Sequence, residues 1–254
     1  MGFLLGFLGA CLGIVAGIGI IVGAIYLKVR SVVGPVGMKE LAEVAKSAKS
    51  IEQQEYSRVK DVSGITKLLE PVIIRDFHDF NKEYLFSKVE KNLRKIFTAI
   101  EEKSLDDIKN DDDLIYMYSG IRDKIKDIKD NNVNIKYDDV QFHSHSIKEY
   151  SKRDGKATLT LSTTLGYYYS NDSDKKIKKH LQGLRKETRY TTQFVYVYDE
   201  TKFKYNQKAI TISCPNCGAP LNKLGEGNCQ YCGTYIKPIN LKGWYMVSYK
   251  EDYK

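Results

Sequence analysis

The sequence predicts an α+β protein, with helices first and an antiparallel sheet afterwards. Apolar residues recur at helical spacing from residue 65 to about residue 130. From Val133 onward the apolar period changes to two, which is the period of a strand with one buried face. Helices that precede a meandering sheet pack on one of its faces. A third feature, a pair of CxxC motifs late in the chain, predicts a small metal-bound insertion in this domain.

The chain begins with an uncharged and almost wholly apolar stretch, Gly2 to Leu27, which is long enough to cross a bilayer as a helix. The first charges, Lys28 and Arg30, follow it directly, and basic residues beside a membrane helix stay on the cytoplasmic side. We therefore expect a single-pass transmembrane helix over residues 1–27 in the cell membrane, with the N-terminus outside and the C-terminal domain in the cytoplasm. A cleaved signal peptide is the alternative, but it would carry a basic residue before a shorter apolar core.

Glycines repeat along this apolar stretch at spacings of four and three, which places them on one stripe of a helix: Gly2, Gly6, Gly9, Gly13 and Gly17. Small residues in this arrangement let two membrane helices approach closely. The stripe predicts a homo-oligomer that forms through Gly9, Gly13 and Gly17. The alternative is that glycine is simply common in membrane helices.

Residues 28–64 are expected to form a juxtamembrane linker. Gly34 and Pro35 break the chain after the membrane, and a polar helix is predicted from Met38 to about Lys60. Its small apolar residues, Leu41, Val44, Ala45 and Ala48, make a stripe that is too weak to bury much. We expect a spacer helix, either solvated or held on the membrane surface through Lys39, Lys46 and Lys49.

Two long amphipathic helices follow. The first is marked by Leu85, Val89, Leu93, Ile96, Phe97 and Ile100, and the second by Leu114, Tyr118, Ile121, Ile125 and Ile128. Between them, Ser104 and Asp107 have the spacing of a capping box that opens a short helical turn. The second helix is expected to end at Asn131 and Asn132. Core packing accounts for both stripes more simply than a partner-binding face.

The strands are predicted from alternation and from turn residues. One strand begins at Val140 and Phe142, Asp154 and Gly155 form a hairpin turn, and a returning strand extends through Tyr167, Tyr168 and Tyr169. Further alternating strands are expected over residues 190–198 and 243–249, on both sides of the cysteine segment.

The two CxxC motifs are Cys214 with Cys217 and Cys229 with Cys232. Four thiolates on two tight turns complete a tetrahedral zinc site with no open position, so we expect one structural zinc ion in an inserted ribbon over residues 212–237. Two disulfides are the alternative, and a redox motif is a further one, although no thioredoxin-like βαβ pattern surrounds either pair. Reduced thiols also favour a cytosolic compartment.

Several segments together resemble a known family. The stretch from Asp79 to Tyr84, the later helix residues through Ile108, and the last strands over 192–198 and 243–247 are similar to the Tim-forty-four-like domain family. This is the C-terminal domain of the subunit that tethers the import motor to the mitochondrial inner-membrane translocase, and bacterial members carry a membrane anchor and a zinc ribbon. The resemblance covers residues 65–211 and 238–254, with the ribbon as an insertion.

The resemblance implies a nuclear-transport-factor-two-like cone, in which helices pack on a curved sheet around an apolar pocket, and it implies association with membranes and polypeptides in transit. Phe194 and Tyr196 are the strand residues expected to line such a pocket. The long basic N-terminal region that engages the motor in the mitochondrial protein has no counterpart here beyond Met38 to Lys60. Motor tethering is therefore not implied.

The predicted function is a membrane-anchored, cytoplasmic-facing binding or scaffold protein, linked to protein transport or membrane-protein handling and without catalytic residues. Anionic lipid and polypeptide segments are the expected partners, and the basic run Lys175 to Lys179 would attract the lipid. A lysine-rich composition explains the net charge of +8 more simply than an anionic partner does.

Two alternatives stay open. A cone-fold enzyme would use His143 and His145, expected on one face of a strand, with Asp139 or Glu149 nearby. The remaining histidines, His78 and His180, have no evident partner in the sequence. A nucleic-acid-binding protein would use the ribbon, the basic run and strand tyrosines. Strand tyrosines usually pack within a sheet, so no nucleic acid is expected.

Overall fold

The structure is a computed structural model that describes residues 28, 39–109, 111–172, 178–199, 214, 217, 219, 228–233 and 243–252. The chain divides into two compact units, Met1–Gln54 and Glu55–Lys254, and we call the second unit the body. The predicted transmembrane residues 1–27, their glycines and Arg30 lie outside the described residues. Among the helices that are described, none is both long enough and apolar enough to span a bilayer.

A helix covers residues 39–57, close to the predicted span from Met38 to about Lys60. It contains no glycine or proline, and most of its residues are good helix formers such as Ala, Glu, Lys and Gln. All of residues 39–51 are exposed. Helix formation here therefore follows local propensity.

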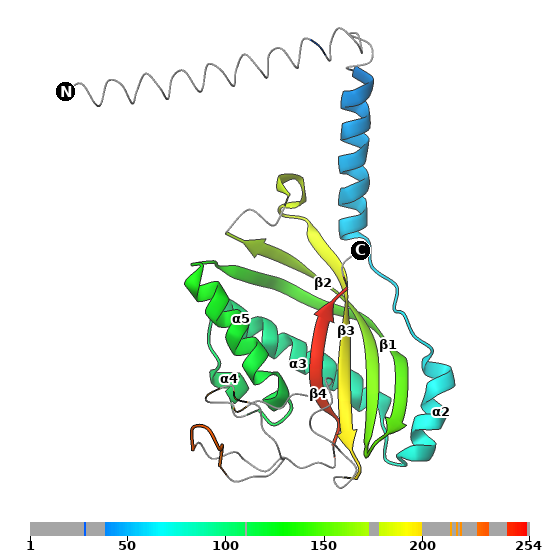
Figure 1. The fold of residues 1–254 in the computed structure, drawn as a ribbon. Helices are drawn as coiled ribbons and strands as arrows, with labels where there is room; N and C mark the ends of the chain where they lie inside the picture. Colours follow the sequence, from blue (N-terminus) through cyan, green and yellow to red (C-terminus); the bar gives the residue numbers. More distant parts are fainter. Residues whose placement is uncertain are drawn as a thin grey trace, which may run out of the picture. The chain divides into compact units, whose positions relative to one another are not determined.

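The body contains helices followed by strands, which confirms the predicted α+β class. Its elements are α2 (Thr66–Asp76), α3 (Lys82–Glu102), α4 (Asp106–Lys109), η1 (Ile115–Met117), α5 (Tyr118–Asp130), β1 (Ile135–Arg153), β2 (Lys156–Asn171), η2 (Lys179–Leu181), β3 (Arg185–Val197) and β4 (Tyr245–Glu251). Figure 1 shows α3 and α5 on one side of the sheet and α2 beside β1. We call the sheet face toward α3 the inner face.

The long helix α3 forms where the sequence predicts it. Asn81 caps its N-terminus by accepting a hydrogen bond from the backbone N–H of Tyr84 at 2.8 Å, and Lys103 ends it in the left-handed conformation with φ of 54°. The predicted stripe is the buried face: Leu85, Val89, Leu93, Ile96, Phe97 and Ile100 are at most 3% exposed. Burying such a stripe against the sheet is the main source of helix stability in a protein.

The four strands form one antiparallel sheet in the order β1-β2-β3-β4. Asp154 and Gly155 connect β1 to β2 with φ of 54° and 77°, the positive values of a type I′ hairpin turn, as predicted. Both β1 and β3 begin five residues earlier than predicted. The first five residues of β3 are all polar or charged, and β1 begins with Ile135 but continues through charged residues such as Lys136 and Asp138. Both segments pair with β2 through the backbone, and an apolar pattern cannot reveal this pairing. The cysteine segment lies between β3 and β4, which are neighbours in the sheet.

Strand β1 lies at an edge of the sheet and is irregular. Its pairing with β2 shifts in register between Asp138 and Gln141, between Phe142 and Ser144, and between Ile147 and Glu149. Asp139 has a positive φ of 52° within the first of these shifts. Such bulges bend an edge strand and hinder edge-to-edge pairing with another chain.

The core lies between the inner face of the sheet and the helices, and aromatic rings fill one part of it. Phe97 of α3 stacks on Tyr137 at 4.5 Å between ring centroids and meets Tyr167 and Tyr190 edge-on at 5.8 and 5.6 Å. Burial raises the pKa of Tyr167 far above its usual value. Phe194 is also fully buried in this core. The apolar pocket that Phe194 was expected to line stays a prediction.

Residues 57–66 form a strap across the sheet. The Ser57 hydroxyl donates to Arg185 O at 3.0 Å, Ser63 N donates to Ser162 Oγ at 3.2 Å, and Ile65 N donates to Ile147 O at 2.8 Å. Ser162 alternates with the buried Leu161, so the strap crosses the outer face of the sheet before it reaches the edge at β1. The last residues of the predicted linker therefore lie against the sheet.

Gly64 allows the strap to lie this close, and we expect Gly64→Ala to detach it. A Cβ there would lie 2.5 Å from Ile147 O and would also overlap the Ser146 hydroxyl. Forced contacts of this kind cost roughly 1–3 kcal/mol. The matched control is Gly120→Ala in α5, where a Cβ meets nothing within 4 Å and alanine should stabilise by about 0.5–1 kcal/mol. Thermal unfolding and proteolysis of the strap measure both; an unchanged unfolding temperature for Gly64→Ala contradicts this packing.

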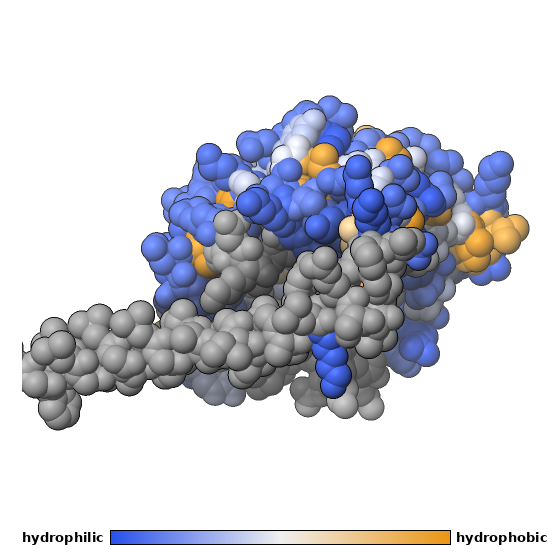
Figure 2. All heavy atoms as spheres, turned by 90° about the horizontal axis from the view of Figure 1, so that it is seen from above, coloured by the Kyte–Doolittle hydropathy of each residue, from blue (hydrophilic) through white to orange (hydrophobic). Residues whose placement is uncertain are grey.

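The visible face of the body is mostly hydrophilic, with a group of apolar side chains at its right edge, the side on which Figure 1 draws α2 (Figure 2). At this helix Ile65, Leu68 and Ile74 are 50%, 70% and 41% exposed. Only Ile73 of α2 is buried. Ile65 and Leu68 lie three residues apart at the start of α2, and neighbouring exposed apolar residues are typical of surfaces that contact a partner.

Candidate metal centre

The four predicted ligands come together in the structure. The Sγ atoms of Cys214, Cys217, Cys229 and Cys232 all lie within 4.8 Å of one another. Two backbone hydrogen bonds hold the cysteine turns: Cys214 N donates to Ala219 O at 2.8 Å, and Gly233 N donates to Cys229 O at 2.9 Å. Gly233 has φ of 71°, a value that glycine adopts without strain. The cluster could therefore hold one metal ion.

The sulfur distances fit a shared ion and not disulfides. Cys214 Sγ lies 3.6 Å from Cys232 Sγ, and Cys217 Sγ lies 3.7 Å from Cys229 Sγ. A tetrahedron with metal–sulfur bonds of about 2.3 Å has sulfur–sulfur edges of about 3.8 Å, whereas a disulfide bond is about 2.0 Å long. The four cysteines of the two motifs are free, so the structure does not contain the two disulfides that were the alternative to a zinc site.

The surroundings of Cys217 favour a bound cation. The backbone amide of Ala219 lowers the pKa of Cys217, but desolvation and hydrogen bonds with the three other thiols outweigh it and raise this pKa to about 12. The thiolate form of Cys217 is therefore disfavoured here unless a cation is bound. A divalent ion that prefers sulfur supplies the positive charge and stabilises all four thiolates.

His143 and His145 do not form one site. The register shift between Phe142 and Ser144 leaves His143 as the extra, unpaired residue of a bulge, so the expectation that His143 and His145 share one strand face is wrong. His143 Nε2 lies 2.7 Å from Glu187 of β3, whereas His145 Nε2 lies 2.8 Å from Glu90 of α3. The two imidazoles therefore contact different elements.

His145 is a packing residue on the inner face. Its Nδ1 lies 3.0 Å from Thr163 Oγ1, and its ring stacks on Phe86 at 5.0 Å. With its contact to Glu90, both ring nitrogens have partners in the neutral and in the charged form, because Thr163 can donate or accept. The fold therefore holds this ring in place through both of its nitrogens.

His143 belongs to a polar network on the outer face. Glu187, only 4% exposed at its side chain, bonds His143 and also Arg185 Nε at 3.0 Å, and Arg185 continues to Asp139 at 2.7 Å. The Gln141 amide and then Arg185 hold the pKa of Asp139 below its usual value, against desolvation. Asp139 and Glu149 were the predicted partners of His143. Asp139 lies in the same network and is linked to His143 through Arg185 and Glu187, whereas Glu149 is exposed.

Sequence reasoning missed Glu187, although one signal could have revealed it. Gly166 pairs with Glu187 across β2 and β3, and a Cβ on Gly166 would overlap the Glu187 carboxylate. Glycine inside a strand often marks a close approach of another group. Here it makes room for Glu187 to reach across β2 to His143.

The other histidines lie apart from this network. His78 is exposed in the turn between α2 and α3, and His180 is half-buried in η2. Of the basic run Lys175–Lys179, only Lys178 and Lys179 are described, and both are exposed.

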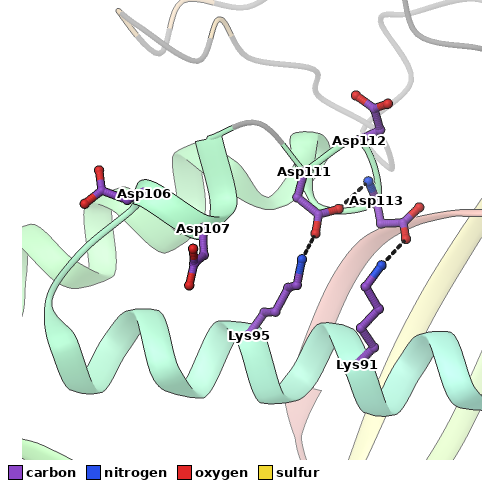
Figure 3. Close-up of a pocket in the computed structure, with 7 residues that line it drawn as sticks. All are labelled: Lys91, Lys95, Asp106, Asp107, Asp111, Asp112 and Asp113. Atoms are coloured by element: carbon purple, nitrogen blue, oxygen red, sulfur yellow. Dashed lines mark hydrogen bonds and ion pairs between the residues drawn. The ribbon is translucent and has the colours of Figure 1, made fainter.

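One pocket of about 520 Å³ lies where α4 and the turn after it face α3, and it is lined by Lys91, Lys95, Asp106, Asp107, Asp111, Asp112 and Asp113. Figure 3 shows both lysines reaching from α3 toward the aspartates, where Lys91 pairs with Asp113 at 3.4 Å and Lys95 pairs with Asp111. Desolvation raises the pKa of Asp111, but the bond from Lys95 and other contacts outweigh it and lower the pKa. The two lysines thus pair with two of the five aspartates that line the pocket.

Comparison of the chain with known protein families, with characterised proteins and with solved structures finds no match.

Proposed function

We propose that this chain is a membrane-anchored binding or scaffold protein that presents its body to the cytoplasm and holds one structural zinc ion. The observation that carries the proposal is the closed set of four thiols. With four protein ligands a tetrahedral zinc ion has no position left for water or substrate, so it organises a fold and does no chemistry.

Three further observations support this role. The apolar stretch Gly2 to Leu27 ends at Lys28 and Arg30, which favours a single-pass anchor with the body inside the cell. Free thiols suit a reducing compartment. The exposed apolar residues Ile65 and Leu68, at the start of α2, offer a contact surface for an apolar polypeptide segment.

The resemblance to the Tim-forty-four-like family extends the proposal to protein transport or membrane-protein handling. In that reading the helices and sheet of the body form a nuclear-transport-factor-two-like cone, and the cysteine segment between β3 and β4 is a zinc ribbon inserted into it. The glycine stripe through Gly9, Gly13 and Gly17 would join copies within the membrane.

The lipid part of the proposal is tested with the body alone, residues 55–254, which is a compact unit. We expect it to sediment with vesicles that contain phosphatidylserine and not with neutral ones, and less so at high salt. Changing Lys178 and Lys179 to Glu should weaken binding, since each basic residue near the surface contributes about 1 kcal/mol. The matched control is Lys126→Glu on the exposed side of α5, which should bind like the wild type.

Equal binding to neutral and acidic vesicles would remove anionic lipid from the proposal.

The alternative that the protein is an enzyme is tested in cells. If His143→Ala with His145→Ala abolished the cellular role while fold and metal content were preserved, an acid–base function would replace the binding function.

A further inference from the structure

The helix over residues 39–57 carries an exposed apolar row. Leu41, Val44 and Ile51 are 51%, 66% and 61% exposed, and Ala48 completes the row. The spacings are three, four and three residues, so all four side chains lie on one face of the helix. Without Ile51 the sequence indicates only a weak stripe. With Ile51 the row covers two heptads.

The row is narrow, with two apolar positions in every seven. Charged residues avoid it, because Glu43, Lys46 and Lys49 lie on other faces of the helix. A stripe of this width and period is the seam of a two-stranded coiled coil. A helix that lies on a lipid surface has a broader apolar face with larger side chains.

The positions beside the seam are compatible with a parallel pair. In a parallel coiled coil, the residue directly before Leu41 or Ala48 lies opposite the residue five positions later in the partner helix. Glu40 then faces Ala45, and Ser47 faces Glu52, so no like charges oppose each other. Ala48 within the seam lets the two backbones approach closely.

We propose that this row is the contact surface for a second copy of the chain, and that two helices over residues 39–57 pair in parallel as a short coiled coil. The parallel direction of the two helices rests on the proposed function, because a membrane anchor gives every copy of the chain the same orientation. Two heptads alone bury little surface, and confinement to the membrane raises the effective concentration of one helix for the other.

The test uses the full chain in the membranes of the expressing cells, with Cys11→Ser as the parent. Single cysteines are added in the seam by Val44→Cys or Ile51→Cys, and on the opposite face by Lys46→Cys or Ser50→Cys. After mild oxidation we expect the two seam variants to form a disulfide-linked dimer several-fold more than the opposite-face variants. Adding Leu41→Glu to the Ile51→Cys chain should remove this dimer, and adding Lys46→Glu should not.

Equal cross-linking at all four positions, or none above the parent, overturns the pairing. Cross-links between a Val44→Cys chain and an Ile51→Cys chain in preference to either with itself would overturn the parallel arrangement. Protection of the seam cysteines from a water-soluble maleimide without cross-linking would assign the row to lipid. If the chain fractionates with soluble proteins and still cross-links at the seam, the pairing stands and the proposed anchor falls.

Discussion

Replacing Cys217 with serine is expected to abolish stoichiometric metal binding and to unfold the cysteine segment. Three remaining thiolates leave the ion with an open position and a weaker site. Structural zinc contributes on the order of 10 kcal/mol or more to the folding of small zinc modules. Metal analysis of the purified protein should find one zinc per chain in the wild type and substantially less in the variant. Because the cysteines lie between β3 and β4 in the chain, the sheet and helices should survive, with circular dichroism near that of the wild type.

Cys11→Ser is the matched control, since it removes the one cysteine that is not in the two motifs, and it should keep the full zinc content. A strong chelator should reproduce the effect of Cys217→Ser on the wild type. A metal-free wild-type protein whose four sulfurs are in disulfides would refute the zinc site and, with it, the argument for a reducing compartment.

Replacing Lys88 with methionine is expected to destabilise the body by about 3–5 kcal/mol, the cost of breaking a buried ion pair. The Lys88 side chain is only 9% exposed, and its Nζ lies 2.7 Å from Asp113 and donates to Trp244 O at 2.7 Å. It ties α3 both to the turn before η1 and to the residue that precedes β4. Methionine keeps the volume but leaves Asp113 and the carbonyl without this donor. Urea unfolding measures the loss.

Lys91→Met is the matched control, because Lys91 pairs with the same Asp113 at 3.4 Å but is 55% exposed. An exposed ion pair contributes only up to about 1 kcal/mol. If both variants lowered the free energy of unfolding by the same amount, the burial of Lys88 would not contribute to the stability of the body.

The sequence predicts the regular parts of this fold well, for a physical reason. The stripe from Leu85 to Ile100 and the hairpin at Asp154 and Gly155 are local patterns, and each has one structural solution. The two CxxC turns likewise limit where their thiols can lie. The structure accordingly confirms α3, the hairpin and the gathering of the four cysteines.

What the sequence could not predict depends on contacts between distant residues. The bulge after Phe142 changes which way the following side chains point, and no local pattern marks it, so His143 and His145 were expected on the same face. In the sequence Glu187 is one more charged residue of a strand, and its role becomes clear only from its pairing with Gly166 in the sheet. The strap near Gly64 looks like a linker because it binds the sheet mainly through backbone groups.

The proposed role depends most directly on where the body lies relative to the membrane. Protease is added to intact cells that express the full chain with a C-terminal epitope, and then to the same cells after permeabilisation. We predict that the protein remains in the membrane pellet after alkaline extraction, that the body resists protease in intact cells, and that it is digested after permeabilisation. Replacing Lys28 and Arg30 with glutamine should weaken this orientation. Digestion of the body in intact cells, or its release into the alkaline supernatant, would contradict a cytoplasmic binding domain held by a membrane anchor.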